Sequence, residues 1–319
     1  MRLFHHFEII FQLLVFLLII MATNSALRRA LHSVHLTAHE ENLLFASRNV
    51  ILHLATPLVT RMGITEKYSE PLQFLDLACG TGVVTDIVQK RVLPETLSRS
   101  KFRATDASEV MLGMTKKRVE LEGWTNVETE VMDAKNMKYP DASFTHVAAA
   151  LALHIIPEPD QVVKESMRVL KPGGIFGATT FSEANSNKWF APDLDSAFRS
   201  LPFKTPSLLP AKMQIHDDGR WTDASWVESN LKALGLADVT AEEVSGTYHF
   251  KDAEEWMKVF EVMIMWTINS RWDEEMRKKM SVGEVKERVL KHLKEKYHGE
   301  GWDVDWTIIV MTGRVPALN

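Results

Sequence analysis

The glycine-rich stretch LQFLDLACGTGVVTD, residues 72–86, holds the side chains and spacings that most clearly allow chemistry. An apolar strand ends at Asp76, and the chain then turns through Gly80, Thr81 and Gly82 into a predicted helix. Such a turn presents backbone N–H groups to an anionic ligand group, and glycine lets the backbone approach the ligand without an intervening Cβ. The loop therefore predicts a small-molecule site at the start of an α/β domain.

The glycine pattern is compatible with nicotinamide dinucleotides, flavins and S-adenosylmethionine. A dinucleotide fingerprint expects a third glycine three residues after Gly82, where this chain has Thr85. S-adenosylmethionine has no phosphate, so the loop amides would meet its methionine carboxylate. Asp76 would then brace those amides and favour the ammonium of the ligand. GTGVVT is therefore a degraded fit to the dinucleotide motif, but a glycine pair alone does not decide between the cofactors.

Two further carboxylates end predicted strands. Asp106 lies 24 residues after Gly82, at the end of FRATD, where it can accept from both ribose hydroxyls of NAD or S-adenosylmethionine. Asp133, in VMDA, can accept from an adenine amino group. Met111 and Met132 offer apolar cover for the adenine ring, although core packing is the commoner role of methionine.

Strand and helix signals alternate from residue 72 to residue 181, which is βαβ order and favours a parallel sheet with helices on both faces. We predict an α/β, Rossmann-like, doubly wound and mostly parallel sheet of about seven strands with an antiparallel edge strand, N-terminal helices and a helical lid insertion. The predicted units are an apolar N-terminal segment (1–26), a helical cap (27–70), the cofactor-binding core (71–182) and an acceptor-binding half with lid helices and closing strands (183–319).

The second half contains the predicted lid. After an irregular, proline-rich stretch, we expect a helix over 222–235 with Thr222 as its N-cap, a strand over 236–250, helices over 253–270 and 273–297, and a last strand over 304–315. The two long helices would form a lid between the closing strands.

One face of the first lid helix is apolar. Trp256, Phe260, Met263 and Trp266 recur at spacings of three or four residues and share that face. Core packing explains most such stripes, but a helix appended beyond the sheet has less core to serve. The stripe, with the segment of Trp189 and Phe190 opposite, therefore predicts an apolar acceptor pocket.

Composition narrows the classes of partner. The formal net charge is −5, and no stripe of Lys and Arg interleaves with aromatics, so nucleic acid is not an expected partner. Cys79 is the single cysteine, which excludes an intramolecular disulfide and a multi-cysteine metal site. Its position in the turn is better explained by its small size than by a nucleophilic role. We predict no metal site.

The apolar run over residues 9–22 leaves three interpretations open: a secretory signal, a membrane anchor that keeps the domain in the cytosol, or an upstream stretch absent from a working protein that begins at Met21. The context at Asn24 and Ala26 disfavours signal cleavage. The sequence does not choose between the membrane anchor and the later start at Met21. We expect a cytoplasmic protein, tethered by 9–22 if the anchor is used.

The motifs FLDLACGTG, ATDASEVML, VMDA, FTHVAAALALHIIPEP and RVLKPGG, in that order over residues 72–182, resemble class I S-adenosylmethionine-dependent methyltransferases, especially the ubiquinone/menaquinone methyltransferase branch. LEGWTNVE, DASFTHVAAALAL and IIVMTGRVP are similar to fungal secondary-metabolism methyltransferases of the gliotoxin bis-thiomethyltransferase type. The quinone enzymes resemble GLRN where this chain has ALHI, which disfavours a quinone acceptor. The resemblance implies a cofactor site made of Asp76, Gly80, Thr81, Gly82, Asp106, Ala107, Met111, Met132, Asp133, Ala134, Ala150 and Leu151.

The resemblance implies methyl transfer from S-adenosylmethionine to sulfur, nitrogen or oxygen of a small, fairly apolar metabolite. His154 follows the fourth strand, and an imidazole with an unperturbed pKa near neutrality is a candidate catalytic base; packing beneath the lid is the competing role. Two other functions stay open: a catalytically weak regulator that binds the donor, and an NAD-dependent oxidoreductase. The latter is disfavoured because no Tyr-x-x-x-Lys pairing is found.

Overall fold

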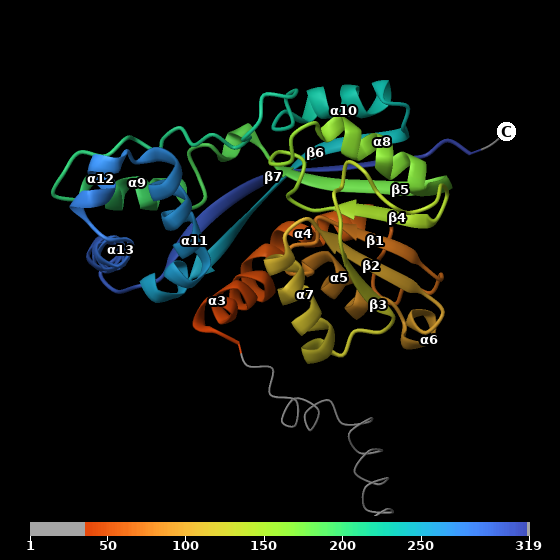
Figure 1. Ribbon diagram of the computed structural model, residues 1–319, viewed down its shortest axis with the longest axis horizontal. Coiled ribbons are helices and arrows are strands. Elements are labelled where there is room, and N and C mark those ends of the chain that lie inside the picture. Colours follow the sequence, from red (N-terminus) through yellow and green to blue (C-terminus); the bar gives the residue numbers. More distant parts are fainter. Residues whose placement is uncertain (1–35, 318–319) are drawn as a thin grey trace, which may run out of the picture.

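The computed structural model describes residues 36–317, and its centre is a seven-stranded sheet (Figure 1). The strand order is β3-β2-β1-β4-β5-β7-β6. The strands are β1 Gln73–Leu77, β2 Lys101–Asp106, β3 Val127–Val131, β4 Phe144–Ala149, β5 Leu170–Phe181, β6 Ala237–Phe250 and β7 Trp302–Arg314. Neighbours among β1 to β5 are parallel, whereas β7 runs antiparallel to both β5 and β6. The predicted fold is confirmed.

Helices cover both faces of the sheet, as parallel strands require. In Figure 1 one layer holds α4, α5 and α7, and the opposite layer holds α8 and α10. Their bounds are α4 Leu52–Arg61, α5 Val83–Arg91, α7 Glu109–Glu122, α8 Pro159–Val169 and α10 Ala224–Ala233, with a short α6 Pro94–Leu97 before β2. The strand order reverses between β1 and β4, so the carboxyl ends of these strands open a crevice for a ligand.

The predicted N-terminal helices form one helical run over residues 38–61. It comprises α3 Ala38–Ala46, a π-helical turn η1 Ser47–Ile51, and α4. Thr37 begins it with a capping box to Glu40. The run is long and apolar enough to cross a membrane, but buried residues such as Leu54 and Leu58 pack it into the main core. The apolar segment 9–22 lies outside the described residues, so its anchor role stays a prediction.

The helical insertion between β6 and β7 differs in detail from the prediction. The helix expected over 273–297 is two helices, α12 Glu274–Lys279 and α13 Val282–Lys296, because Met280 is extended and Ser281 caps α13 in a capping box with Glu284. The predicted N-cap at Thr222 is wrong: the Asp223 side chain accepts from the Trp226 N–H and caps α10.

Buried polar contacts hold this insertion against the body. A helix that the sequence did not predict, α9 Ala191–Arg199, follows a 3-10 turn η2 Glu183–Asn185 and packs on α13. Its Asp193 is buried and accepts from the Tyr297 hydroxyl at 2.6 Å, from Lys296 Nζ at 2.8 Å and from Trp302 Nε1 at 3.0 Å. Because three donors from α13, its end and β7 meet one carboxylate, the lid region is fixed to the sheet.

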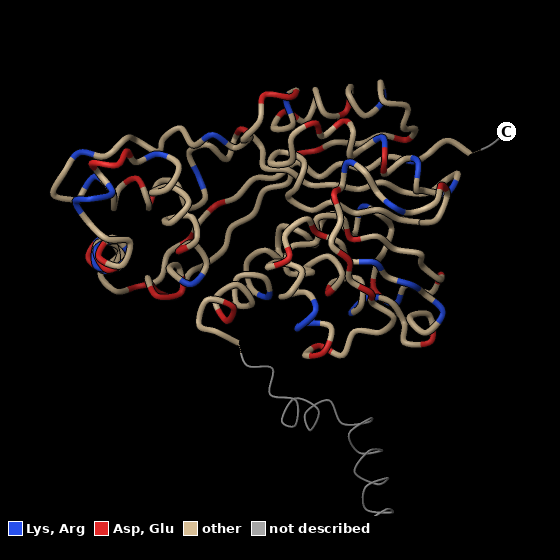
Figure 2. Tube along the Cα trace, in the orientation of Figure 1, with Lys and Arg blue, Asp and Glu red and all other residues tan. Residues whose placement is uncertain are grey.

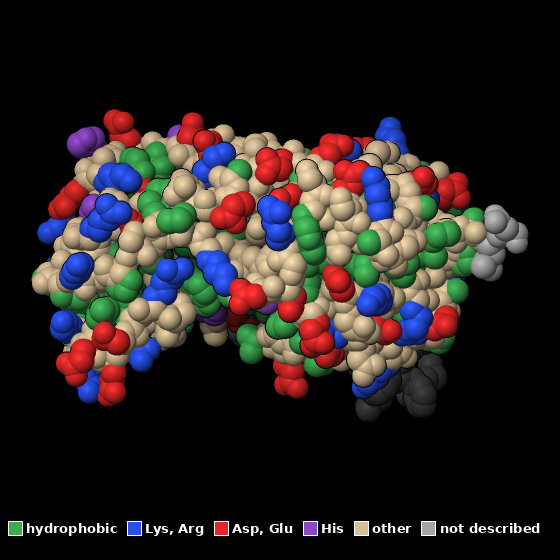
Figure 3. All heavy atoms as spheres, turned by 90° about the horizontal axis from the view of Figure 1, so that it is seen from above, with side chains coloured by type: hydrophobic (Ala, Val, Ile, Leu, Met, Phe, Trp, Pro, Cys, Tyr) green, Lys and Arg blue, Asp and Glu red, His purple; other side chains and the backbone are tan. Residues whose placement is uncertain are grey.

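Charged residues are spread over the helices and loops. β4 has none, and β5 has only Lys171, so these two central strands are almost uncoloured in Figure 2. Figure 3 shows acidic and basic side chains interspersed over the face seen from above. No single-signed field covers that face.

Candidate active site

The turn after β1 requires glycine at two positions. Gly80 and Gly82 both have positive φ, at +56° and +75°. A Cβ on Gly82 would also lie 2.9 Å from Cη2 of Trp124 and 3.2 Å from Cγ2 of Thr115, whereas nothing lies within 4 Å of one on Gly80. Gly82 is therefore fixed by packing beneath the loop, and Gly80 leaves open space on its exposed side.

The carboxylate of Asp106 holds the loop at the end of β2. Its Oδ2 accepts from the Gly80 N–H at 2.9 Å, and its Oδ1 accepts from the Ser108 N–H at 2.8 Å. Each oxygen keeps a lone pair for another donor. Asp106 is thus positioned to accept from a ligand while it fixes the glycine turn.

A buried arginine that the sequence analysis missed supports the loop from α7. Arg118 is fully buried, donates from Nη1 to the Thr81 carbonyl at 2.9 Å, and lies 3.1 Å from Oδ2 of Asp86. Its guanidinium stacks 4.9 Å from the centroid of the Trp124 ring. The sequence gives no local signal for this contact, because 37 residues separate Arg118 from Thr81.

The π-helical turn η1 places a second unpredicted side chain on the loop. Ser47 Oγ lies 2.6 Å from Thr81 Oγ1, and both side chains are buried. A π-turn interrupts regular helix and often occurs at functional sites. The N-terminal helical run therefore covers the glycine loop directly.

Asp76 braces the helix after the loop rather than the loop amides. Its Oδ2 accepts from the Thr85 N–H at 3.0 Å and from Thr85 Oγ1 at 2.7 Å, so the threonine that replaces a third glycine serves as a donor. Its Oδ1 is buried and has no hydrogen-bond partner in the described part of the chain. Burial raises the pKa of this carboxyl to about 7.

The predicted cofactor residues converge on one cavity of about 510 Å³, a volume within the roughly 300–1,000 Å³ of small-molecule sites. Gly82 shapes the turn but does not line it. The predicted residues that do are Asp76, Gly80, Thr81, Asp106, Ala107, Met111, Met132, Asp133, Ala134, Ala150 and Leu151. We call this the donor cavity. Its charged lining residues are three aspartates, without Lys or Arg, which suits a ligand with cationic groups.

A second cavity of about 370 Å³ adjoins the donor cavity, and we call it the acceptor cavity. Leu151, Ile155 and Val262 line both. Its wall is mainly apolar and includes Phe181, Trp189, Phe190, Met213, Met263 and Trp266. The prediction of an apolar pocket against α11 (Ala253–Arg271) holds for Met263 and Trp266, but not for the other half of the stripe.

Trp256 and Phe260 do not line the acceptor cavity, so the prediction is wrong for these two residues. They are 0% and 3% exposed and belong to the hydrophobic core that joins α11 to the sheet. The stripe winds around α11, so its first two turns face the core and its later turns face the cavity. Helical spacing identifies a shared face but not what that face meets.

His154 lines the acceptor cavity and is 4% exposed. Its ring meets Phe181 edge to face, with centroids 5.4 Å apart, and its Nδ1 has no partner within residues 36–317. Burial lowers the pKa of the imidazole to about 3, so the ring is neutral at physiological pH and a weak base. The predicted base role is untested, and burial argues for a neutral hydrogen-bonding role.

Cys79 has the surroundings of a packing residue. It is buried, and burial raises the pKa of its thiol well above the ordinary value. Its Sγ lies 3.7 Å from Thr115 Oγ1. Low thiolate content argues against a nucleophilic role. Residues 36–317 hold no group of His, Cys, Asp and Glu suited to a metal ion.

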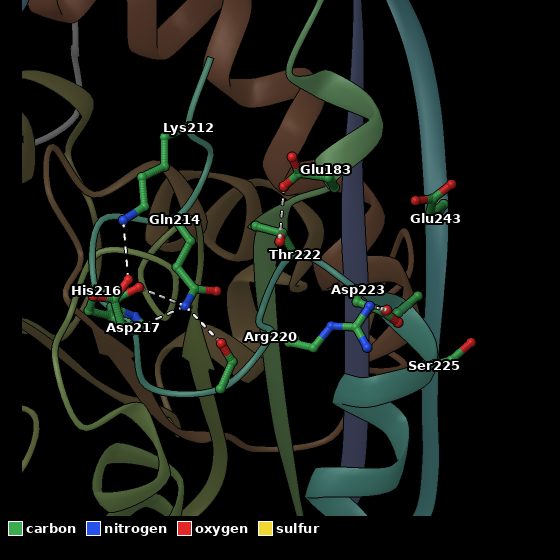
Figure 4. Close-up of a pocket in the computed structure, with 12 residues that line it drawn as sticks. Glu183, Lys212, Gln214, His216, Asp217, Arg220, Thr222, Asp223, Ser225 and Glu243 are labelled. Carbon is green, nitrogen blue, oxygen red and sulfur yellow. Dashed lines mark hydrogen bonds and ion pairs between the residues drawn. The ribbon is translucent and has the colours of Figure 1, made fainter. Parts of the chain in front are cut away.

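A third hollow, of about 800 Å³, lies beside η2 and the start of α10 (Figure 4). Its charged side chains largely pair with one another: Lys212 with Asp217 at 3.2 Å, and Arg220 with Asp223 at 2.5 Å. Neither the glycine loop nor Asp106 reaches it. The site chemistry therefore centres on the first two cavities.

Comparison with known proteins decides the family. A methyltransferase-domain family matches residues 74–174. The demethylmenaquinone methyltransferase of Lactobacillus johnsonii is 32% identical over 197 residues, which cover 57% of this chain and 77% of that protein. The chain belongs to the class I S-adenosylmethionine-dependent methyltransferases.

Two fungal relatives extend the match of this methyltransferase into its second half. Methyltransferase tpcH of Aspergillus fumigatus is 27% identical over 264 residues, which cover 82% of this chain and 91% of that protein. The acetylaranotin bis-thiomethyltransferase of Aspergillus terreus is 24% identical over 265 residues, covering 82% and 88%. The methyltransferase uses S-adenosylmethionine, so the oxidoreductase interpretation is set aside.

Proposed function

We propose that this methyltransferase transfers a methyl group to sulfur, nitrogen or oxygen of a small, largely apolar metabolite bound in the acceptor cavity. The observation that carries the proposal is the shared wall: Leu151, Ile155 and Val262 line both cavities. Because the two cavities adjoin at these residues, a methyl group bound in the donor cavity can face a nucleophile bound in the acceptor cavity. Reacting atoms must approach within about 3–3.5 Å in line.

The residues present in the donor cavity fit S-adenosylmethionine. Asp106 would accept from the ribose hydroxyls and Asp133 from the adenine amino group. The open side of Gly80, where no atom lies within 4 Å of an added Cβ, would admit the methionine carboxylate. The unpartnered Oδ1 of Asp76 would accept from the ammonium. When bound, the donor supplies a methyl group on a sulfonium, an already activated leaving group.

The protein then has to position the acceptor and exclude water. The acceptor's lone pair forms the new bond to the methyl carbon, the old carbon–sulfur bond breaks, and its electron pair stays on sulfur as a neutral thioether. We expect the apolar wall to limit the access of water to the nucleophile once the acceptor is bound. A thiolate or free amine attacks without a base, which matches the weak basicity of His154.

Relatives support a metabolite acceptor in secondary metabolism. The two fungal matches each cover 82% of the chain and thus include much of the acceptor half. One of them is named a bis-thiomethyltransferase, which favours sulfur as the first acceptor atom to test. We also propose that the catalytic domain works in the cytoplasm, where the donor is made.

A screen with methyl-labelled S-adenosylmethionine tests the proposal. Apolar thiols, amines and phenols are incubated with the full chain, and both the labelled product and S-adenosylhomocysteine are measured. The Asp106→Ala variant controls for background transfer. We expect turnover with at least one apolar acceptor class. Tight donor binding with no acceptor-dependent turnover across the panel would instead support a donor-binding regulator.

A further inference from the structure

The acceptor cavity carries an unbalanced positive charge. Its charged lining residues are Lys212 and Arg271, and no Asp or Glu of the described chain lines it. Lys212 has a 59% exposed side chain and pairs with Asp217 at 3.2 Å. Its charge is therefore largely balanced at the surface, and Arg271 is the cation that remains.

Arg271 is half-buried and unpaired. It is the last residue of α11, and its guanidinium makes no hydrogen bond or ion pair with another residue between 36 and 317. A cation in the last turn complements the helix dipole, which explains its sign. That interaction leaves the planar fork of N–H donors free. Such a fork matches a carboxylate in geometry as well as in charge.

The position of Arg271 places this charge far from the donor. Val262 lies at the wall that both cavities share, and Arg271 follows it by nine residues along α11. A helix rises 1.5 Å per residue, so about 13 Å of helix axis separates them. Met263 and Trp266 lie between, and both contribute apolar lining.

We propose that Arg271 binds an anionic group on the acceptor, at the end of the molecule remote from the methylated atom. This inference rests on the proposed function, because it names the class of acceptor that the same cavity takes. The acceptor is then an apolar acid: a nucleophilic sulfur, nitrogen or oxygen at the donor end, an apolar body against Trp266 and Phe181, and a carboxylate or similar anion at Arg271.

A matched pair of fluorescent probes tests the inference without methyl transfer. 8-Anilinonaphthalene-1-sulfonate is an apolar anion, and N-phenyl-1-naphthylamine has the same rings without the sulfonate. Both are titrated into the full chain at low salt. Charge-assisted hydrogen bonds are worth roughly a tenfold to hundredfold in affinity. We expect Arg271→Gln to weaken the sulfonate probe about tenfold or more and to change the neutral probe less than about twofold.

Three further variants accompany the experiment. Arg288→Gln removes an exposed arginine of α13 that lines neither cavity, so both probes should bind as to the unaltered chain. Met263→Trp fills the acceptor cavity and should weaken both probes. Unfolding midpoints are measured for every variant. Arg271→Lys keeps the charge and should retain part of the selectivity, so it tests the inference even if glutamine at 271 perturbs the fold.

Equal binding of the sulfonate probe to the unaltered chain and to Arg271→Gln would overturn the inference. Unchanged affinity of both probes for Met263→Trp would also overturn it, because the probes would then bind outside the acceptor cavity. Because the probes report binding alone, an acceptor panel without turnover contradicts the proposed function and leaves this result intact. If turnover occurs with neutral acceptors and Arg271→Gln does not change probe binding, the inference of an anionic acceptor is wrong and the proposed methyl transfer stands.

Discussion

The donor and acceptor cavities share a wall but differ in charge and in construction. Three aspartates supply the charged lining of the donor cavity, whereas a lysine and an arginine supply that of the acceptor cavity. The first is built from strand ends and the loops after them, the second mainly from α11 and the segment before α10. The separation of sign suits a cationic donor that meets a neutral or anionic acceptor.

The supports of the two cavities differ as well. Asp106 accepts from the Gly80 N–H, and Thr115 and Arg118 donate to the carbonyls of Gly80 and Thr81, so the shape of the glycine loop depends on a few atoms. The acceptor cavity is held by packed aromatic side chains that tolerate gradual change. Substitutions should therefore cause large, discrete losses on the donor side and graded losses on the acceptor side.

The largest effect should follow removal of the Asp106 carboxylate. Asp106→Ala loses the predicted ribose contacts and frees the Gly80 and Ser108 N–H groups. We expect at least about a 100-fold loss of affinity for S-adenosylhomocysteine in calorimetry, since two or more charge-assisted bonds disappear. Asp238→Asn, at the far sheet edge, is the control. Undiminished affinity in Asp106→Ala would contradict the donor assignment.

Gly82→Ala should separate the loop's packing from its backbone conformation. The added Cβ would lie 2.9 Å from Trp124, and alanine would have to adopt the unfavourable φ of +75°. Gly63→Ala has the φ penalty alone, at +84°, with no atom within 4 Å. We expect about 1–2 kcal/mol of destabilisation at Gly63 and a greater loss at Gly82, measured by denaturant unfolding. Only the Gly82 variant should lose donor affinity; equal effects would refute the packing argument.

Asp76 should make donor binding depend on pH. Burial raises the pKa of Asp76 from 3.8 to about 7, so the folded protein binds this proton more tightly than the unfolded chain. The protonated carboxyl therefore stabilises the fold at low pH, and this stabilisation is lost as the pH rises from 3.8 through about 7. An ionised carboxylate attracts the donor's ammonium, so affinity for S-adenosylhomocysteine should increase about tenfold from pH 6 to pH 8. Asp76→Asn should flatten the calorimetric profile, and an unchanged slope would assign it to another group.

Trp266→Ala should raise KM for an apolar acceptor by roughly 5–20-fold, because a large aromatic contact of the acceptor cavity is lost. Donor affinity should stay constant. Met265→Ala removes a neighbouring exposed side chain that does not line the cavity, and its KM should not change. If the two variants behave alike, Trp266 does not contact the acceptor.

The smallest effect should come from His154. Burial lowers its pKa from 6.5 to about 3, so the unfolded chain binds this proton more tightly, and the stability from the neutral ring is lost as pH falls below about 6.5. The pH profile of kcat should therefore show no change near pH 6–7 that is caused by protonation of His154. We expect His154→Gln to change kcat less than about threefold. A loss of kcat at low pH that the unaltered chain shows and His154→Gln lacks would establish His154 as a catalytic base.

Sequence alone determined the donor side well. Gly80, Gly82 and Asp106 were predictable because strand ends and tight turns impose local demands on residue type, and parallel strands bring their carboxyl ends to one edge. The resemblance to methyltransferases supplied others, such as Ala107, Ala150 and Leu151, and eleven of the twelve residues that it implies line the donor cavity. Helix breaks were less predictable: a polar, charged stretch over 273–297 hid the capping box at Ser281.

Tertiary structure decided what the helices face. Periodicity grouped Trp256 and Phe260 with Met263 and Trp266, but only docking of α11 on the sheet sends the first pair to the core and the second to the cavity. Ser47, Arg118 and Arg271 have no local signature, because their roles depend on contacts or on isolation from counter-charges across long sequence separations. Backbone conformation is a local property of the chain, whereas burial and electrostatic surroundings arise only when distant segments pack.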